Sequence, residues 1–336
     1  TARAPPRTSR TNLSSSEAGA PRLVVVGDYA WDVLIRTNSP LQSGGDVFGE
    51  VQLAAGGSAA NTAVWAQRCG LQTHFIGKIG HDSFGQLAVE ELRAEGLSAD
   101  WVRSDAHLTG AVAVWIDQVG ERSMVSGKGA DHYLLPSELP VETLGGAQHL
   151  HLHGWSFFGD PPRAAARRAA KLVTQGGGRV SFDPGSFQMI SQMGVERFLS
   201  VTTDLGADLI FPNFEEGKVL SGEDEPEKIC ARLHELYPGA LVVLKLDSSG
   251  CYVYERGRGE YLGAVSTRLV DSTGAGDSFA GAFIADWLTG AAPVEAARRA
   301  NRVSAWVVER VGARPLPDEA LAQVLPPAAR SVANRR

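Results

Sequence analysis

Most of the chain alternates between short apolar runs and longer segments in which apolar residues recur every three or four positions. The short runs are predicted to be strands, at 23–26, 73–79, 149–153, 179–183, 208–211 and 241–246. The longer segments are predicted to be helices, at 58–69, 83–95, 161–173, about 275–289 and 293–310. Strands and helices that alternate in this way predict an α/β fold, in which helices cover both faces of a parallel sheet.

Two segments, 33–54 and 109–127, break this rhythm. Both contain stretches in which apolar and polar residues alternate, and in the second segment these stretches flank a turn at Gly120 and Glu121. Alternation around a turn is typical of antiparallel hairpins with one face exposed. We therefore expect a small β-sheet that projects from the main domain and covers the active site as a lid.

The chain shows no linker or shift in composition between Arg22 and Pro326, so we predict a single domain over 21–326. Residues 1–20 are rich in Arg, Ser, Ala and Pro and contain one acidic residue, which favours a disordered tail over a transit peptide. Residues 327–336 are expected to form a frayed tail.

Composition narrows the classes of partner. The net charge of −6 provides no positive field for nucleic acid or for an anionic membrane surface. No apolar run approaches the roughly 20 residues that a membrane-spanning helix needs. The three cysteines lack the spacing of a zinc site or a disulfide framework, so we expect reduced thiols and a cytoplasmic location.

The segment 269–283, LVDSTGAGDSFAGAF, carries the strongest chemical signal. A glycine-rich turn leads into a helix, and free amides at a helix start attract anions such as phosphate. A carboxylate at Asp277 would repel that anion, which makes sense if it accepts a proton from an attacking hydroxyl. The alternative is structural: Gly274 and Gly276 form a turn, and Asp277 caps the helix.

This segment resembles the D-T-x-G-A-G-D signature of the ribokinase-like carbohydrate kinases, the PfkB family. The resemblance implies a three-layer α/β/α fold with a doubly wound sheet and a small β-sheet lid, and it implies transfer of the γ-phosphate of ATP to a hydroxyl. It also implies that Asp277 is the base and that three backbone amides stabilise the transferring group. The matching residues are Asp271, Thr273, Gly274, Ala275, Gly276 and Asp277.

A second motif, in 54–70, is similar to the G-G-x-x-x-N element of the same family. The resemblance implies that Gly56 and Gly57 bring backbone against the sugar and that Asn61 bonds its hydroxyls. Upstream, 24–33 resembles the opening strand of the family and puts Asp32 where sugar hydroxyls are held; a carboxylate can accept two such bonds. The alternative is that Asp32 is a turn residue and Asn61 a surface amide.

Two further resemblances imply which residues bind the nucleotide and its metal ion. FPNFEE at 211–216 matches the family element N-x-x-E through Asn213 and Glu216, which in relatives organise Mg²⁺ through water. The same two residues are also suited to a helix-capping box, and both roles are compatible. Potassium is a candidate ion, because Asp271 and the segment 310–313 loosely match the region where many relatives bind it.

The segment 241–254 resembles the strand-turn-strand that lies along ATP, with Gly250 matching. Lys245 and Asp247 depart from the Thr and Gly that are common in the family, which puts the detailed phosphate contacts in doubt, although Lys245 is available to the phosphates. Asn301 falls where the family lines the adenine pocket. The alternating histidines at 149–153 share one face of a strand, but they lack partners at zinc-ligand spacing, and His151 or His153 is expected to touch substrate.

These patterns predict an ATP-dependent kinase that acts on an unphosphorylated sugar, with ribose favoured over fructose or 2-keto-3-deoxygluconate. A nucleoside is the next candidate, and a phosphosugar would need basic residues in the lid, for which Lys128 and Arg122 are available. A catalytically inactive regulatory protein is disfavoured by the retained Asp277. A nicotinamide-dependent oxidoreductase would need a glycine-rich turn after the first strand, where GDYAWD has one glycine. Exposed lid strands favour a homodimer through the lids.

Overall fold

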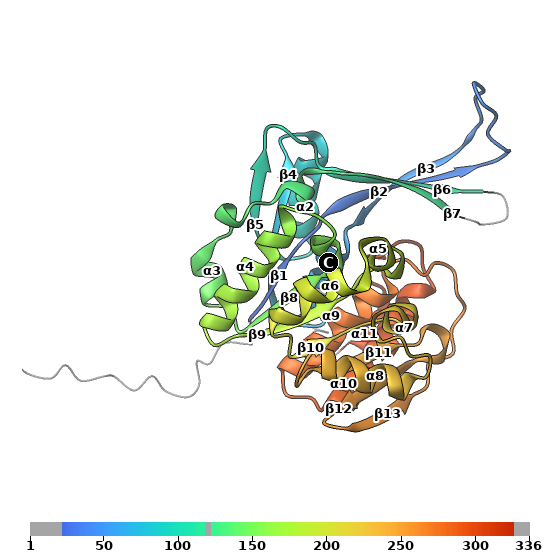
Figure 1. Cartoon of the computed structure of the whole chain (residues 1–336). Coiled ribbons are helices and arrows are strands. Elements are labelled where there is room, and N and C mark those ends of the chain that lie inside the picture. Colours follow the sequence, from blue (N-terminus) through green and yellow to red (C-terminus); the bar gives the residue numbers. More distant parts are fainter. Residues whose placement is uncertain (1–21, 118–121, 326–336) are drawn as a thin grey trace, which may run out of the picture.

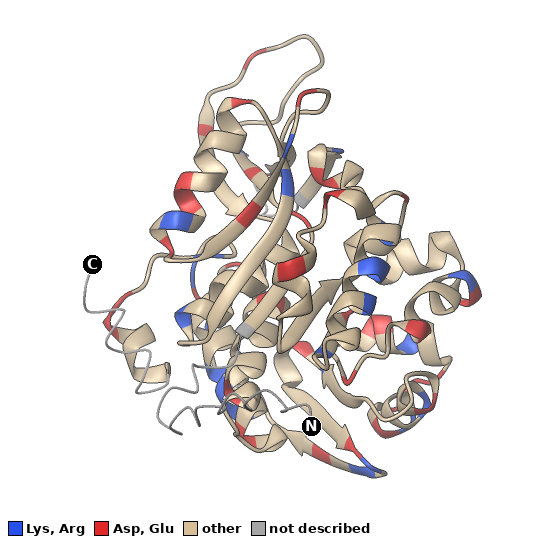
Figure 2. Cartoon of the chain, turned by 90° about the vertical axis from the view of Figure 1, so that its left-hand side faces the viewer, with Lys and Arg blue, Asp and Glu red and all other residues tan. Residues whose placement is uncertain are grey.

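The computed structural model describes residues 22–117 and 122–325, so the predicted tails at 1–20 and 327–336 lie outside the described residues. The chain forms one sheet of nine strands and a second sheet of four (Figure 1). No helix in the described part of the chain is both long and apolar enough to cross a membrane. Acidic and basic residues are interspersed over the helices seen in Figure 2.

The large sheet is doubly wound. From β1 the chain moves outward through β4 and β5, then returns to pair β8 with the other side of β1 and continues to β13. All pairs between β5 and β11 are parallel, while β12 and β13 form an antiparallel edge. In spatial order the strands are β13 (Arg258–Leu262), β12 (Cys251–Glu255), β11 (Leu241–Lys245), β10 (Leu209–Ile210), β9 (Arg179–Asp183), β8 (His149–His153), β1 (Arg22–Val26), β4 (Gln72–Gly80) and β5 (Ser98–Ser104).

Helices cover both faces of this sheet because its central strands are apolar on both sides. In β1, Leu23 and Val25 pack into one core, and Val24 and Val26 pack into the other. The first core is shared with α1 (Ser58–Arg68), α2 (Ser83–Ala94), α9 (Ala275–Leu288), α10 (Pro293–Val308) and α11 (Glu319–Val324). The second is shared with α3 (Val141–Gly145), α4 (Pro162–Gln175), α5 (Phe187–Met193), α6 (Val195–Thr202), α7 (Phe214–Ser221) and α8 (Pro226–Leu236). The α/β/α layers predicted from the sequence are confirmed.

The small sheet is the predicted lid, and it extends away from the large sheet in Figure 1. Its order is β3 (Gly49–Gly56), β2 (Ala30–Thr37), β6 (Gly110–Ile116) and β7 (Arg122–Gly127). Two antiparallel hairpins, β2–β3 and β6–β7, are joined by parallel pairing of β2 with β6. The first lid strand begins at Ala30, so Asp32 belongs to the lid and not to the opening strand of the large sheet.

Some predicted boundaries differ from the structure. The strand expected at 208–211 is regular only at Leu209–Ile210, since Pro212 follows closely and cannot donate a backbone hydrogen bond. The helix expected at 293–310 ends at Val308. Because the sheet order reverses between β1 and β8, the carboxyl ends of these strands form the crevice in which a doubly wound fold binds its ligand.

Candidate active site

A pocket of about 310 Å³, here called the lid pocket, lies between the lid and the carboxyl end of β1. Side chains alternate along a strand, so the lid presents every second residue to this pocket. The starts of α1 and α9 form the opposite wall. The lid residues that line it are Ala30, Asp32, Leu34, Ala54, Gly110, Val112, Val114, Met124, Ser126 and Gly127.

Asp277 lines the lid pocket from the first turn of α9. The preceding turn requires glycine at Gly274, where φ is 73° and a Cβ atom would come within 2.6 Å of the Ala313 backbone. Burial raises the pKa of the Asp277 carboxyl, against the opposing effects of His153 and of a hydrogen bond from Asn61. The amide of Ala275 donates to the Ser272 carbonyl at 3.2 Å, so one of the three amides expected to face an anion is used within the turn.

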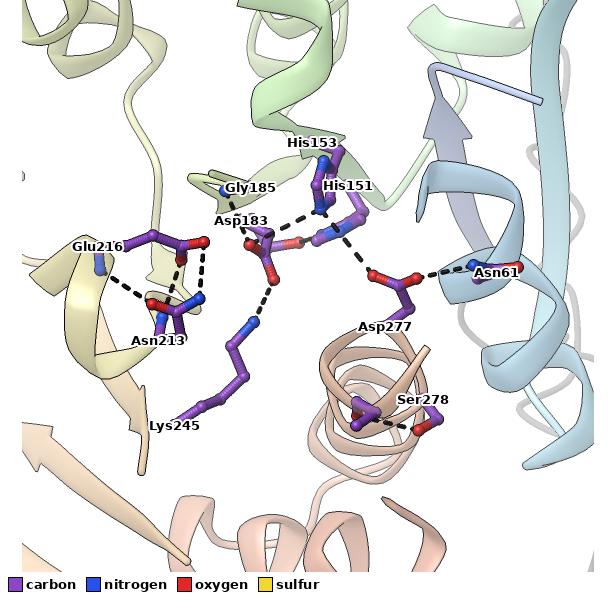
Figure 3. A network of polar contacts seen from close by, with 12 residues as sticks. Asn61, His151, His153, Asp183, Gly185, Asn213, Glu216, Lys245, Asp277 and Ser278 are labelled. Atoms are coloured by element: carbon purple, nitrogen blue, oxygen red, sulfur yellow. Dashed lines mark hydrogen bonds and ion pairs between the residues drawn. The ribbon is translucent and has the colours of Figure 1, made fainter. Parts of the chain in front are cut away.

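Asn61 lies on α1 beside Asp277, as the close view in Figure 3 shows. Its Nδ2 donates to Asp277 Oδ2 at 2.8 Å. Its Oδ1 accepts from Arg314 Nε at 2.7 Å, and Arg314 also donates to Glu91 and to the Gly56 carbonyl. Asn61 is therefore buried and bonded on both sides, contrary to the alternative of a surface amide.

Asp32 projects from β2 into the lid pocket, next to the two glycines of the second motif. A Cβ at Gly56 would come within 2.7 Å of Asp32 Oδ2, and a Cβ at Gly57 would come within 2.7 Å of the Asp28 carbonyl. Burial raises the pKa of Asp32 to about 6, although the charge of Arg314 opposes the shift. Gly56 thus allows the backbone to pack closely against this carboxylate, and Gly57 allows the start of α1 to pack against the segment that follows β1.

Three charged or polar side chains meet at the carboxyl ends of β8, β9 and β11 (Figure 3). Lys245 Nζ donates to Asp183 Oδ2 at 2.6 Å. His153 Nε2 lies 3.7 Å from Asp183 Oδ1 and 4.0 Å from Asp277 Oδ1. Burial alone would raise the pKa of Asp183, but the Lys245 ammonium and His153 hold it below its usual range. We call His153, Asp183 and Lys245 the strand-end cluster.

Lys245 also reaches the glycine-rich turn of α9. A Cβ at Gly276 would come within 3.1 Å of Lys245 Nζ, so the ammonium lies against the helix start. An anion at this helix start would meet both the helix dipole and a cation. The departure of Lys245 from the family pattern therefore still puts a positive charge at the expected phosphate position.

Asn213 and Glu216 form a capping box at the start of α7. The Glu216 carboxylate accepts from the Asn213 backbone amide and side-chain amide, both at 2.9 Å, and Asn213 Oδ1 accepts from the Glu216 amide. Burial, helped by the charge of Asp183, raises the pKa of Glu216 to about 7. These oxygens keep second lone pairs, which fits Mg²⁺ held through water better than direct ligation.

The remaining predicted residues are spread around the site. Asp271 joins two segments, since its carboxylate accepts from the amides of Thr273 and Gly312. Gly250 has φ of 102° and approaches the Leu262 carbonyl so closely that a Cβ would lie 2.1 Å from it. Asn301, on α10, donates to the Gly263 carbonyl at 3.4 Å.

The buried histidines of β8 do not form a metal site. His149 Nε2 and His151 Nδ1 both bond the Ser181 hydroxyl, at 2.8 Å and 2.9 Å. Burial lowers the pKa of each to about 3, so both rings are neutral. Within residues 22–117 and 122–325, no group of three His, Cys, Asp or Glu side chains is arranged to hold a metal ion. His153, at the end of β8, belongs to the strand-end cluster.

Two residues of this site were missed in the sequence. Asp183 ends a predicted parallel strand, and a polar residue at the carboxyl end of such a strand is a signal that could have found it. Arg314 lies in the irregular segment after α10, and no local pattern marks it.

Comparison with known proteins tests the resemblance. Residues 20–320 match the model of the pfkB family carbohydrate kinases. The chain is 32% identical over 270 residues to a fructokinase of Escherichia coli, covering 79% of this chain and 83% of the relative. It is 30% identical over 299 residues to an ATP-dependent ribose-1-phosphate kinase of Halopiger xanaduensis, covering 88% and 95%.

Solved structures have the same architecture. An Arabidopsis thaliana ribokinase complexed with ribose and ATP is 26% identical, with a TM-score of 0.76 and coverage of 94% of this chain and 98% of that one. An Escherichia coli protein in complex with ATP and Mg²⁺ has a TM-score of 0.75 at 24% identity, with coverage of 88% and 94%. The family model spans most of the chain, and the fold and the motifs agree with it. The chain belongs to the pfkB family of carbohydrate kinases, phosphotransferases that act on an alcohol group.

Proposed function

We propose that the chain transfers the γ-phosphoryl group of ATP to a hydroxyl of an unphosphorylated sugar, with Asp277 as the general base. The observation that carries this proposal is the position of the Asp277 carboxylate, which lines the lid pocket from the first turn of α9. In-line phosphoryl transfer needs a proton acceptor beside the attacking hydroxyl and stabilisation of charge on the transferring group. A carboxylate at an anion-attracting helix start meets both needs.

In this step the sugar oxygen attacks the γ-phosphorus, the bond to the bridging oxygen of ADP breaks, and the hydroxyl proton passes to Asp277. Burial raises the pKa of Asp277, which makes it a better proton acceptor than an exposed carboxylate. The hydrogen bond from Asn61 holds Oδ2, so the carboxylate keeps one orientation.

ATP is proposed to place its γ-phosphate at the start of α9, where the amides of Gly274 and Gly276 and the Lys245 ammonium surround an anion. The closeness of Lys245 Nζ to Gly276, where an added Cβ would come within 3.1 Å of it, supports this position. Gly250 and Asn301 are proposed to flank the nucleotide. Mg²⁺, held through water by Asn213 and Glu216, would neutralise charge on the ATP phosphates. A potassium ion beside Asp271 stays a prediction.

The acceptor is proposed to be uncharged. Several carboxylates line the lid pocket, and no Lys or Arg does so among the residues that the structure describes. Lys128 lies outside this lining, and the side chain of Arg122 is not described. A phosphate group on the acceptor would therefore meet Asp32 and Asp131 without a Lys or Arg, and His132, the ionisable cation of the lining, is already paired with Asp131 at 2.9 Å. Ribose, ahead of fructose and 2-keto-3-deoxygluconate, is the first candidate, with Asp32, Asn61 and the backbone at Gly56 and Gly57 as its contacts.

A nucleoside is the second candidate, and one feature of the lid pocket favours it. Besides the polar wall formed by its carboxylates, the pocket presents the apolar side chains of Leu34, Val112, Val114, Met124 and Trp155. A surface of this kind suits a nucleobase better than a bare sugar, which exposes hydroxyls in every direction.

We further propose a cytoplasmic homodimer that forms through the lids. The lid face opposite the lid pocket carries Val51 and Val125, which are 72% and 73% exposed, together with Leu53. An exposed apolar sheet face is a common dimer interface. Light scattering that gives a monomer at micromolar concentration would count against this assembly.

A coupled assay of ADP formation tests the function. Ribose, fructose, 2-keto-3-deoxygluconate, adenosine and fructose phosphates are supplied with ATP and Mg²⁺ to the wild type and to Asp277→Asn. We expect turnover with one unphosphorylated acceptor and a loss of about 10²–10⁴-fold in kcat for the variant. ATP binding without turnover for any acceptor would favour an acceptor outside this panel or the inactive regulatory protein.

A further inference from the structure

Arg314 is a buried arginine beside the lid pocket, in the segment that follows α10. Its side chain is 3% exposed. The guanidinium donates to Asn61 Oδ1 at 2.7 Å, to Glu91 Oε2 at 2.7 Å and to the Gly56 carbonyl at 2.6 Å, and it lies 5.3 Å from the ring centre of Tyr29. One side chain thus ties together α1, α2 and the end of lid strand β3.

This contact fixes the orientation of the Asn61 amide. An asparagine has one acceptor oxygen and one donor nitrogen on its side chain. Because Arg314 holds the oxygen, the nitrogen faces Asp277 Oδ2 and donates to it at 2.8 Å. If the amide were flipped, its nitrogen would face the donors of Arg314 and its oxygen would face the carboxylate of Asp277, so neither hydrogen bond could form.

We propose that Arg314 is a positioning residue for phosphoryl transfer, because its hold on the Asn61 amide fixes the hydrogen bond that Asn61 donates to the Asp277 carboxylate. This inference rests on the proposed role of Asp277 as the base. Arg314 acts through Asn61 on the base and through the Gly56 carbonyl on the strand end that packs against Asp32.

The other charged groups around Asp277 do not accept a hydrogen bond from Arg314, which donates to Asn61, Glu91 and Gly56. His153 from β8, Asp183 from β9, Lys245 from β11 and Asp32 from the lid face it. Of these four, Asp32 is affected by the charge of Arg314, which opposes the rise in its pKa. A variant that keeps the positive charge at position 314 therefore separates the loss of the hydrogen bond to Asn61 from a change in the electrostatic effect on Asp32.

The test compares Arg314→Met and Arg314→Lys with a matched control, Arg68→Met. Arg68 is also buried, pairs with Glu95 at the C-cap of α2, donates to the Pro315 carbonyl and lies over Trp65, but it has no hydrogen bond with Asn61. We expect Arg314→Met to lower kcat roughly 10–100-fold and to move the acid limb of the kcat profile to higher pH, since Asp277 loses a fixed donor.

Lysine keeps the charge but lacks the planar fork, so Arg314→Lys is expected to restore neither kcat nor the profile. Arg68→Met is expected to lose stability but to keep the wild-type kcat and pH profile. In an Asn61→Ala background, Arg314→Met should lower kcat no further. An additive loss, an unchanged profile in both Arg314 variants, or the same shift in Arg68→Met would overturn the inference.

A readout without turnover separates this inference from the proposed function. The difference in unfolding free energy between wild type and Asp277→Asn, followed against pH, has a midpoint that reports the proton affinity of Asp277. We expect the midpoint to rise when Arg314 is replaced by Lys or Met. If the wild type turns over no acceptor, the proposed function fails, whereas an unmoved midpoint refutes the role of Arg314.

Discussion

The two sides of Asp277 hold their carboxylates in opposite ways. On the side proposed for the nucleotide, Asp183 is bonded to the Lys245 ammonium at 2.6 Å, and its pKa is lowered despite burial. On the side proposed for the acceptor, Asp32 accepts no hydrogen bond from the described residues, and burial raises its pKa to about 6. The buried carboxylate is compensated by a cation on the first side and has no hydrogen-bond donor among the described residues on the second. This difference suits one substrate that is a polyanion and a second that is a polyol.

The largest effect is expected on the nucleotide side. Lys245→Met removes the closest ion-pair partner of the buried Asp183 and leaves it only His153 at 3.7 Å. We therefore expect the free energy of unfolding to fall by up to about 3–5 kcal/mol at neutral pH, measured by urea denaturation. The pKa of Asp183 is lowered in the folded chain, so this contribution is present above a pH of about 4 and is lost as the pH falls through the folded pKa.

Lys228→Met is the matched control for that prediction. Lys228 of α8 pairs with Glu225, the residue before this helix, at 2.8 Å on the surface, where an exposed ion pair contributes little to stability. Adding Asp183→Leu to Lys245→Met should recover much of the lost stability, because no unpaired charge then remains. Equal losses of unfolding free energy in the Lys245 and Lys228 variants would contradict the conclusion that Lys245 compensates the buried charge of Asp183.

On the acceptor side, the sign of the stability effect reverses. The folded pKa of Asp32, about 6, is above the unfolded value of about 3.9, so the folded chain loses stability as the pH rises between these values. Asp32→Asn removes this penalty, and we expect the variant to be more stable than wild type above a pH of about 6 and equal to it near pH 4.

The same substitution should weaken the use of the acceptor. A hydrogen bond to a charged group contributes about 1.5–3 kcal/mol, so kcat/KM for the acceptor is expected to fall roughly 10–100-fold while the KM for ATP stays unchanged. Steady-state kinetics with each substrate varied in turn measure both. A rise in the KM for ATP alone would contradict the assignment of Asp32 to the acceptor and would place it with the nucleotide.

The sequence predicted this division only in part. The fold followed from periodicity, and the glycine turn before Asp277, the Asn213–Glu216 box and Asp32 were each visible within a short motif. Arg314 and Asn61 are 253 residues apart, so their contact depends on the packed fold and leaves no local pattern. The pairing of Asp183 with Lys245 depends on the packed fold in the same way, since β10 joins their strands, although the place of Asp183 at the end of a predicted strand was a local signal.

A smaller effect is expected at the capping box on the nucleotide side. Asn213→Ala removes the side-chain acceptor for the Glu216 amide, and the loss of such a cap lowers the free energy of unfolding by about 1 kcal/mol. If the pair also holds Mg²⁺ through water, the Mg²⁺ concentration needed for half-maximal activity rises as well. Ser186→Ala, at the cap of α5, is the control that should lose stability without changing the Mg²⁺ dependence.

The smallest expected effect decides between the two acceptors. Trp155 lines the lid pocket and is 41% exposed, so Trp155→Ala should change stability little. If the acceptor is a sugar alone, the polar wall holds it and its KM changes less than about threefold, since an exposed side chain away from those contacts contributes little. If the acceptor is a nucleoside, loss of the aromatic face costs about 1–3 kcal/mol of base stacking and the KM for adenosine rises at least about fivefold. Measuring both substrates on one variant makes each the control for the other, because a general disturbance of the lid would raise both KM values together.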